Sequence, residues 1–200
     1  MEKKYKLTEE SINYCDKTLY RIEALKDFGI VKKGDKGGYI ENENNLSQEG
    51  NCWISDNAKV YDIARVSGNA KVFDNALVFG NAKVCGNAKV YDYAKVSDNA
   101  LVYGDAFVYD NALVCGNAQV SGSAEIKDNS DYIVFKNWWS SGRHFTWTRN
   151  NNMWKVGCFY GTSEELIKKA YEDSEISGRE YERVVNYVES MLRDTKRIGD

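Results

Sequence analysis

The sequence predicts a mainly β protein in which a parallel β-helix of six-residue repeats is flanked by an N-terminal cap and a small C-terminal α+β domain. The first observation is a period of six that runs from Gly50 to Lys127 without an insertion or deletion, which makes 13 hexads. The second is that the third place of each hexad is Ala, except at Cys52, and the fifth is Val, except at Ile54 and Ile126. The third is that every hexad begins with Gly or Asp.

The order of residues within a hexad indicates one short strand and one bend. Ala and Val stand two places apart, so in an extended chain both side chains point to the same face, which is the interior. Gly or Asp, usually followed by Asn, tolerates the turn conformations that a bend needs. Coils stacked about 4.8 Å apart would bury a continuous apolar column and pair their backbone groups. A flat meander of short strands is disfavoured, because it needs regular hairpin lengths.

The repeat resembles that of the hexapeptide-repeat superfamily, over at least Gly50 to Lys127. The resemblance implies a left-handed parallel β-helix in which three hexads form one triangular coil, so that residues 18 positions apart stack in columns. Phe73, Tyr91 and Tyr109 would then form an aromatic ladder. The resemblance also implies a homotrimer, since proteins of this superfamily are commonly trimers.

The outward fourth places of the hexads form columns whose character changes along the chain. Lys71 and Lys89 stack in a column that continues with Phe107, and the columns are generally basic toward the N-terminal end and apolar toward the C-terminal end. Exposed apolar columns typically mark an interface, and closed rotational symmetry would bury them. Alternatively, the C-terminal segment folds back over them. The lysine column is interpreted as a solvated face and not as a ligand site.

Residues 1–43 are expected to cap a β-helix that comprises residues 44–130. A hairpin is predicted around Asp16 and Lys17, followed by a Gly-rich loop. The imperfect segments 38–43 and 44–49 are expected to form an irregular first coil. The bare end of a β-helix exposes unpaired strand edges, which a cap covers.

Residues 131–200 are expected to form the C-terminal α+β domain. Aromatic, partly alternating runs over 131–161 predict a small antiparallel sheet of about three strands. Two helices are predicted, at about 163–173 and 178–194. Their starts are taken from two capping-box patterns, Thr162 with Glu165 and Ser177 with Glu180.

Composition limits the possible partners. The N-terminus lacks an apolar signal-peptide core and no apolar run is long enough for a membrane span, so the protein is expected in the cytoplasm and not in a membrane. The formal net charge of -3 argues against binding of double-stranded nucleic acid. The five cysteines are an odd number without a CxxC pair, which predicts reduced thiols. No metal site and no cofactor are predicted.

The segment 131–162 concentrates cations and tryptophans. It holds four Lys or Arg residues against one acidic residue, four of the five tryptophans and the only histidine. Ring surfaces beside fixed cations suit a small nucleotide-like anion. The predicted ligand-binding residues are Trp138, Trp139, Arg143, His144, Thr146, Trp147, Arg149 and Lys155. The alternative is that the tryptophans form the core of the sheet while the cations flank it.

The two ends of the chain resemble a family of phage and prophage proteins that pair a hexapeptide β-helix with a short C-terminal domain. The residues that match its C-terminal pattern are Ser141, Arg143, Thr146, Thr148, Cys158, Phe159, Gly161 and Thr162. The chain departs from that pattern at Trp147 and Gly157, which argues against paired-thiol chemistry. The resemblance implies a phage setting in the cytoplasm of a bacterial host. By analogy, small oligomeric phage proteins of this kind can counter host defence by sequestering nucleotide signals.

The leading functional hypothesis is a non-enzymatic oligomeric scaffold that sequesters a small anionic, nucleotide-like ligand. A structural phage protein, or one that binds a protein partner, is the alternative. An enzyme similar to the hexapeptide acyltransferases is the third hypothesis, but no histidine or interrupting loop lies within the repeat. Thiol catalysis by Cys158 would need His144 beside it, so no catalytic residue is predicted.

Overall fold

The computed structural model describes the backbone of residues 2–198 and the side chains of residues 2–193. It divides into two compact units, each described by itself below. One comprises the residues up to Ile133 together with Thr148–Asn151, and the other comprises Val134–Trp147 and the residues from Asn152 onward. No helix within residues 2–198 has both the length and the apolar character that a bilayer crossing requires.

The N-terminal segment is a hairpin that joins the first coil. Strand β1 (Tyr5–Tyr14) pairs antiparallel with β2 (Lys17–Ala24), and Cys15 and Asp16 turn the chain with φ values of 49° and 60°. Strand β3 (Lys36–Ile40) pairs antiparallel with β2 and parallel with β5, so the hairpin extends one sheet of the β-helix. The predicted hairpin around Asp16 and Lys17 is confirmed.

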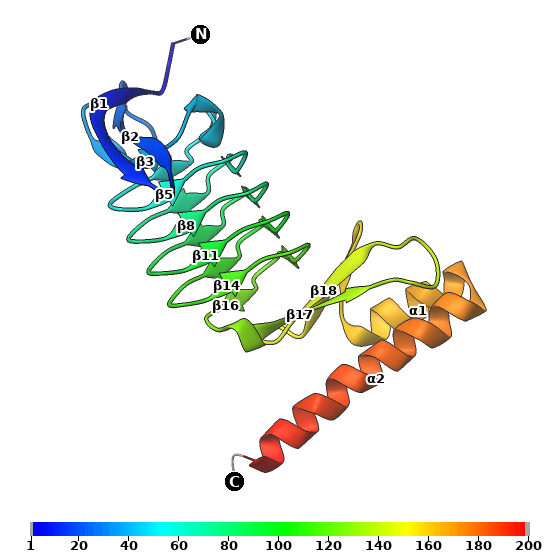
Figure 1. Ribbon diagram of the computed structural model, residues 1–200. Coiled ribbons are helices and arrows are strands. Elements are labelled where there is room, and N and C mark those ends of the chain that lie inside the picture. Colours follow the sequence, from blue (N-terminus) through cyan, green and yellow to red (C-terminus); the bar gives the residue numbers. More distant parts are fainter. Residues whose placement is uncertain (1, 199–200) are drawn as a thin grey trace. The chain divides into compact units, whose positions relative to one another are not determined.

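The hexads form 13 two-residue strands that stack in parallel (Figure 1). They are Trp53–Ile54 (β4), Lys59–Val60 (β5), Arg65–Val66 (β6), Lys71–Val72 (β7), Leu77–Val78 (β8), Lys83–Val84 (β9), Lys89–Val90 (β10), Lys95–Val96 (β11), Leu101–Val102 (β12), Phe107–Val108 (β13), Leu113–Val114 (β14), Gln119–Val120 (β15) and Glu125–Ile126 (β16). Their sheets run β3-β5-β8-β11-β14, β16-β13-β10-β7-β4 and β15-β12-β9-β6. Partners are 18 residues apart, as in Lys71 with Lys89, so the parallel β-helix of three hexads per coil is confirmed.

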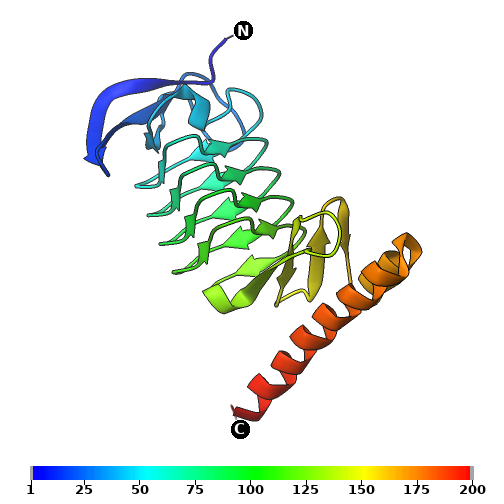
Figure 2. The same ribbon diagram turned by 45° about the vertical axis from the view of Figure 1, so that its right-hand side comes forward.

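The repeat residues account for the narrow interior and the tight corners. Every Ala at the third place and every Val or Ile at the fifth is buried. The corners use left-handed backbone, for example at Asp56 with φ 56° and Gly86 with φ 69°. A Cβ added to Gly86 would lie 2.8 Å from the backbone nitrogen of Gly104, so this corner has no room for a side chain. The stack of coils is also visible in Figure 2.

Outside the strand pairs, the backbone hydrogen bonds between coils run in one direction, so the two ends of the β-helix expose different backbone groups. In these bonds the N–H donates to a carbonyl of the following coil, as from Lys71 to Ala88 at 2.9 Å. The first coil is therefore left with unpaired carbonyls, and side chains of the N-terminal segment supply donors. The Tyr5 hydroxyl donates to Leu46 O at 2.7 Å, and the Asn45 amide donates to Ala64 O at 2.9 Å.

The last coil has N–H groups and carbonyls without a following coil. The segment after the repeat supplies acceptors for the N–H groups, and the Tyr132 hydroxyl donates to Leu113 O at 2.9 Å. Asn129 Oδ1 accepts from the Leu113 N–H at 2.8 Å. Asn150 Oδ1 accepts from the Glu125 N–H at 2.9 Å, and Asp131 Oδ2 accepts from the Lys127 N–H at 2.9 Å. These side-chain contacts close the C-terminal end of the β-helix.

The C-terminal residues form a sheet and two helices, as predicted. Strands β17 (Tyr132–Lys136), β18 (His144–Thr148), β19 (Met153–Val156) and β20 (Phe159–Gly161) pair in chain order, which gives four strands where about three were expected. Helix α1 spans Ser163–Asp173 and begins with the predicted capping box of Thr162 and Glu165.

The predicted start of the last helix is wrong. Helix α2 spans Glu175–Ile198 and begins before the expected cap at Ser177. Ser174 ends α1, and its hydroxyl also accepts a hydrogen bond from the Ser177 N–H at 3.1 Å. Ser174 therefore takes the capping role at the start of α2, and Ser177 lies inside the helix.

Candidate functional site

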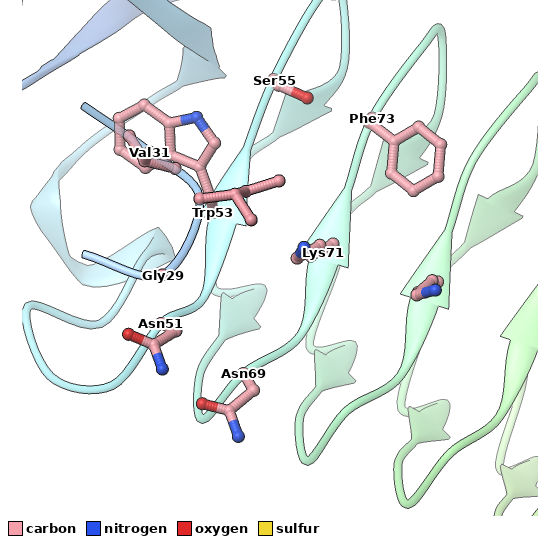
Figure 3. A pocket seen from close by; sticks show the side chains of 10 residues that line it. Gly29, Val31, Asn51, Trp53, Ser55, Asn69, Lys71 and Phe73 are labelled. Atoms are coloured by element: carbon pink, nitrogen blue, oxygen red, sulfur yellow. The ribbon is translucent and has the colours of Figure 1, made fainter. Parts of the chain in front are cut away.

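A groove of about 540 Å³ runs along the outer face of β4, β7 and β10 (Figure 3). Its size lies within the range of small-molecule sites. The strands present Trp53, Lys71 and Lys89 in succession, and the loop at Gly29–Val31 borders one end. Every lining residue belongs to the β-helix unit.

Two lysines on adjacent strands line the groove. Lys71 and Lys89 are direct partners in the parallel ladder, and both side chains are half-buried. Lys89 Nζ lies 5.0 Å from the centre of the Phe107 ring. Among residues 2–193, neither ammonium group has a carboxylate partner. Like charges on neighbouring strands repel each other, so the groove favours an anion.

The predicted aromatic ladder is present, and it ends inside the groove. Phe73 stacks on Tyr91 with centroids 4.9 Å apart, and Tyr91 stacks on Tyr109 at 5.2 Å. Burial raises the pKa of Tyr91. One coil before Phe73 the same column holds Ser55, whose hydroxyl donates to the carboxylate of Asp56 at 2.9 Å. Within the described side chains, no ring covers the face of Phe73 that is turned toward Ser55.

The N-terminal cap holds the wall of the groove in place. Trp53 is buried between Tyr5 and Phe28, with ring centroids 6.4 Å and 5.4 Å away. Phe28 and Val31 exchange backbone hydrogen bonds of 3.0 Å and 2.9 Å, which close a tight turn. The exposed Ile30 projects from this turn. These contacts within the cap position the wall without a ligand, an arrangement that lowers the ordering cost of binding.

Asparagine side chains form a hydrogen-bonded row along the corner of the β-helix beside Lys71 and Lys89. The Asn69 amide donates to Asn87 Oδ1 at 3.0 Å, and the Asn87 amide donates to Asp105 Oδ1 at 2.9 Å. Because these amides all donate toward the C-terminal end, the carbonyl oxygen of Asn69 faces the coil of Asn51. Asn51 and Asn69 both line the groove and can hydrogen-bond to a ligand.

A neighbouring face has a second, more open depression that differs in its charge pattern. Its column alternates Lys59, Leu77, Lys95 and Leu113, so no two ammonium groups lie on adjacent strands. Lys59 Nζ lies 5.1 Å from the centre of the Tyr14 ring, and burial lowers the pKa of Lys59. The groove of Lys71 and Lys89 is the stronger candidate for a multiply charged anion.

The three tryptophans predicted to bind ligand differ in how deeply they are buried. Trp147 is 1% exposed, and its indole N–H donates to Asn152 Oδ1 at 2.8 Å. Thr146 beside it is also buried, so burial removes both residues from the surface that a ligand could reach. Trp139 is half-buried with its ring perpendicular to Tyr181. Trp138 is 75% exposed.

The predicted cations also separate. Arg143, His144 and Lys155 belong to the C-terminal unit, whereas Arg149 belongs to the β-helix unit. The backbone N–H of Arg149 donates to the carbonyl of Asp131 at 2.7 Å. Of the eight predicted residues, Arg143 lines the cavity formed by residues after β17, the β19–β20 turn and the two helices.

Sequence reasoning missed the residues of the groove although one signal was present. The spacing of 18 places Lys71 beside Lys89 and Ser55 beside Phe73, but the lysine column was interpreted as a solvated face. The turn at Gly29–Val31 and the orientation of Trp53 depend on contacts that the repeat pattern does not contain.

Comparisons with known proteins agree with this architecture. A family model described as the YdcK Beta solenoid repeat matches residues 106–122. The repeat is of the β-solenoid type. The chain is also 44% identical over 62 residues to a protein of Escherichia coli (strain K12) named "Uncharacterized acetyltransferase YdcK". That similarity covers 27% of the chain and 19% of the relative, so the chain spans about a fifth of the relative's length.

Proposed function

We propose that this protein is a non-enzymatic β-solenoid scaffold that binds and sequesters a small anionic, nucleotide-like ligand in the groove of Trp53, Lys71 and Lys89. The observation that carries the proposal is the pair of ammonium groups on adjacent strands without a carboxylate partner in the described part of the chain. The anionic group of the ligand lies between Lys71 and Lys89. Charge-assisted hydrogen bonds of this kind are about twice as strong as neutral ones.

The ring of the ligand stacks on Phe73. Phe73, Tyr91 and Tyr109 form a ladder that ends at Ser55, which has no ring. A planar group of the ligand can therefore stack on Phe73 as the next ring of the ladder. Stacking of a base on an aromatic side chain contributes about 1–3 kcal/mol. A nucleoside phosphate joins such a ring to an anion.

The composition of the groove supports binding without turnover. Its lining residues are glycine, apolar and aromatic residues, asparagine, serine and lysine, with no histidine, cysteine or carboxylate to act as a general base. Sequestration requires only a Kd below the working concentration of the ligand. In the phage setting that the family resemblance implies, such a protein would bind a host signal nucleotide and oppose defence.

Self-association as a homotrimer is part of the proposal. Ile30, Ile63 and Tyr93 are exposed on the outside of the β-helix unit. Large apolar side chains on several faces suit burial by further copies of the chain around a threefold axis. Native mass spectrometry tests this, and a strictly monomeric protein at micromolar concentration would contradict it.

The binding test uses isothermal titration calorimetry of the full chain with AMP, adenosine and ribose 5-phosphate. AMP is expected to bind most tightly, since it alone carries both the ring and the phosphate. Replacing both lysines (Lys71→Gln with Lys89→Gln) is expected to weaken AMP binding at least about a hundredfold, because each of the two charged hydrogen bonds contributes about 1.5–3 kcal/mol.

Arg65→Gln with Lys83→Gln is the matched control. These two cations are also direct partners in a parallel ladder, but they lie on another sheet and away from the groove. AMP recovered chemically unchanged supports sequestration. If both double variants lost AMP binding equally, the loss would reflect net charge alone and would contradict the proposed site. No binding of any probe, with a stoichiometric protein co-purifying instead, would favour the protein-partner hypothesis.

Acetyl transfer is the second candidate function, because the similar protein of Escherichia coli is named an acetyltransferase. The only histidine, His144, lies in the C-terminal unit and outside the repeat. Incubation with acetyl-CoA and a panel of amine and hydroxyl acceptors, followed by detection of released thiol, tests this function. Thiol release that is lost on His144→Ala would overturn the non-enzymatic proposal.

A further inference from the structure

The C-terminal unit contains a separate cavity of about 330 Å³. The residues after β17, the turn between β19 and β20, and helices α1 and α2 all contribute to its lining. Its volume is at the lower end of the range for small-molecule sites, which suits a compact ligand. The groove of the β-helix shares no residue with it.

A buried pair of polar side chains, Asn137 and Tyr181, lines this cavity. Asn137 is 4% exposed and Tyr181 is 7% exposed. The Asn137 amide oxygen accepts from the Ser140 N–H at 3.0 Å and from the Ser140 hydroxyl at 3.1 Å. These bonds orient the amide so that its N–H donates to the Tyr181 hydroxyl at 3.0 Å. Since the Tyr181 oxygen accepts this bond, its own hydrogen is left to donate, and no acceptor for it occurs among the described side chains.

The exposed side chain of Arg143 also lines this cavity. Arg143 has no carboxylate partner among residues 2–193. A Cβ added to Gly157 would lie 3.3 Å from the Arg143 guanidinium, so the guanidinium rests over a residue that has no side chain. The one carboxylate in the lining, Asp173, already lies 3.8 Å from Lys169 Nζ. The cavity therefore keeps a net positive charge.

We propose that this cavity binds a compact oxyanion, a carboxylate or a phosphate, between the guanidinium of Arg143 and the hydroxyl of Tyr181. The planar guanidinium can hold two oxygens at once, and the Tyr181 O–H donates to one of them. The Ser141 hydroxyl, which lines the same cavity, supplies a further donor. Donors from Arg143, Tyr181 and Ser141 line one cavity, which suits an acceptor-only ligand.

The test is a titration of the full chain with sodium phosphate and with sodium acetate, at an ionic strength held constant with sodium chloride. Trp139 reports on binding through its fluorescence and its indole N–H resonance, because its ring centroid lies 4.9 Å from that of Tyr181. Saturable binding of at least one anion is expected. Saturation by acetate identifies a carboxylate ligand, and saturation by phosphate alone identifies a phosphoryl ligand.

Two conservative variants and one control separate this site from general charge effects. Tyr181→Phe keeps the ring and removes only the hydroxyl, and Arg143→Gln removes only the charge and fork. Each is expected to weaken binding about tenfold or more, with partial recovery in Arg143→Lys. Arg183→Gln, on the exposed side of α2 beside Glu180, should leave the affinity unchanged.

The proposal is overturned if wild type shows no saturation, or if Tyr181→Phe and Arg143→Gln, folded by circular dichroism, bind as wild type does. Binding that survives in the Lys71→Gln, Lys89→Gln double variant distinguishes this site from the groove. The two proposals can therefore fail independently.

Discussion

The ammonium group of Lys4 donates to the carbonyl oxygen of Cys52 at 3.0 Å and lies 3.3 Å from its sulfur. Lys4 is buried, and its nitrogen also lies 3.4 Å from the carbonyl oxygens of Glu49 and Gly50 and 5.0 Å from the centre of the Phe28 ring. These carbonyls belong to the first coil and have no preceding coil to pair with. A single lysine thus replaces several backbone donors at the open end of the β-helix.

Lys4→Met is expected to destabilise the protein by about 1–3 kcal/mol, the cost of leaving buried acceptors unpaired. Methionine keeps the apolar stem but removes every donor. Urea unfolding followed by circular dichroism measures the change. Lys3→Met is the control, because the ion pair of Lys3 with Glu43 is exposed and contributes little. Equal stabilities of the two variants would contradict the capping role.

The contribution of Lys4 to stability is expected to rise with pH. Burial lowers the pKa of Lys4 below its ordinary 10.5, against the opposing influence of Cys52. Between the folded and the unfolded pKa, the unfolded chain binds more protons, so the free energy of unfolding increases with pH in that window. The free energy of unfolding is compared between Cys52→Ala and the double variant Cys52→Ala with Lys4→Met. Their difference gives the contribution of Lys4 without titration of the Cys52 thiol. A difference that stays constant from pH 7 to pH 10 would count against the lowered pKa.

The acceptor cap at the other end predicts a smaller effect. Asn150→Ala removes the acceptor of the Glu125 N–H and is expected to cost about 0.5–1.5 kcal/mol, less than Lys4→Met because the site is more exposed. Asn117→Ala is the control, since Asn117 occupies an exposed corner of the β-helix. Thermal unfolding of both variants checks the prediction.

Ser55→Phe is expected to complete the aromatic ladder from within the chain. The new ring would stack on Phe73 and stabilise the fold by about 0.5–1.5 kcal/mol. It would also occupy the surface proposed for the ligand's ring, so binding of AMP should weaken at least tenfold while binding of ribose 5-phosphate persists. Ser67→Phe is the control. Ser67 has the same hexad place as Ser55, but the next residue in its column is Cys85, which has no ring to stack on. This variant should change neither the stability nor the binding of AMP. If Ser55→Phe bound AMP as the wild type does, the adenine ring would not stack on Phe73.

The elements that the sequence predicted well are those whose contacts repeat locally. Ala and Val two places apart, with Gly or Asp at each corner, determine the strand, the bend and the buried face of every hexad. A spacing of 18 then predicts the ladder of Phe73, Tyr91 and Tyr109. The start of α2 was misplaced because Ser174 and Ser177 are both good caps, and only the end of α1 decides between them.

The amino-acid sequence is enough to predict a parallel β-helix with a column of lysines, because its strict period places every apolar Ala and Val on one face. The tertiary structure decided where ligands can bind. The wall beside Trp53 comes from a turn more than one coil away in sequence, and Asn137 meets Tyr181 across 44 residues. It also decided that Trp147 lies in the core while Trp138 is exposed. No repeat encodes these contacts, since each depends on how distant segments pack.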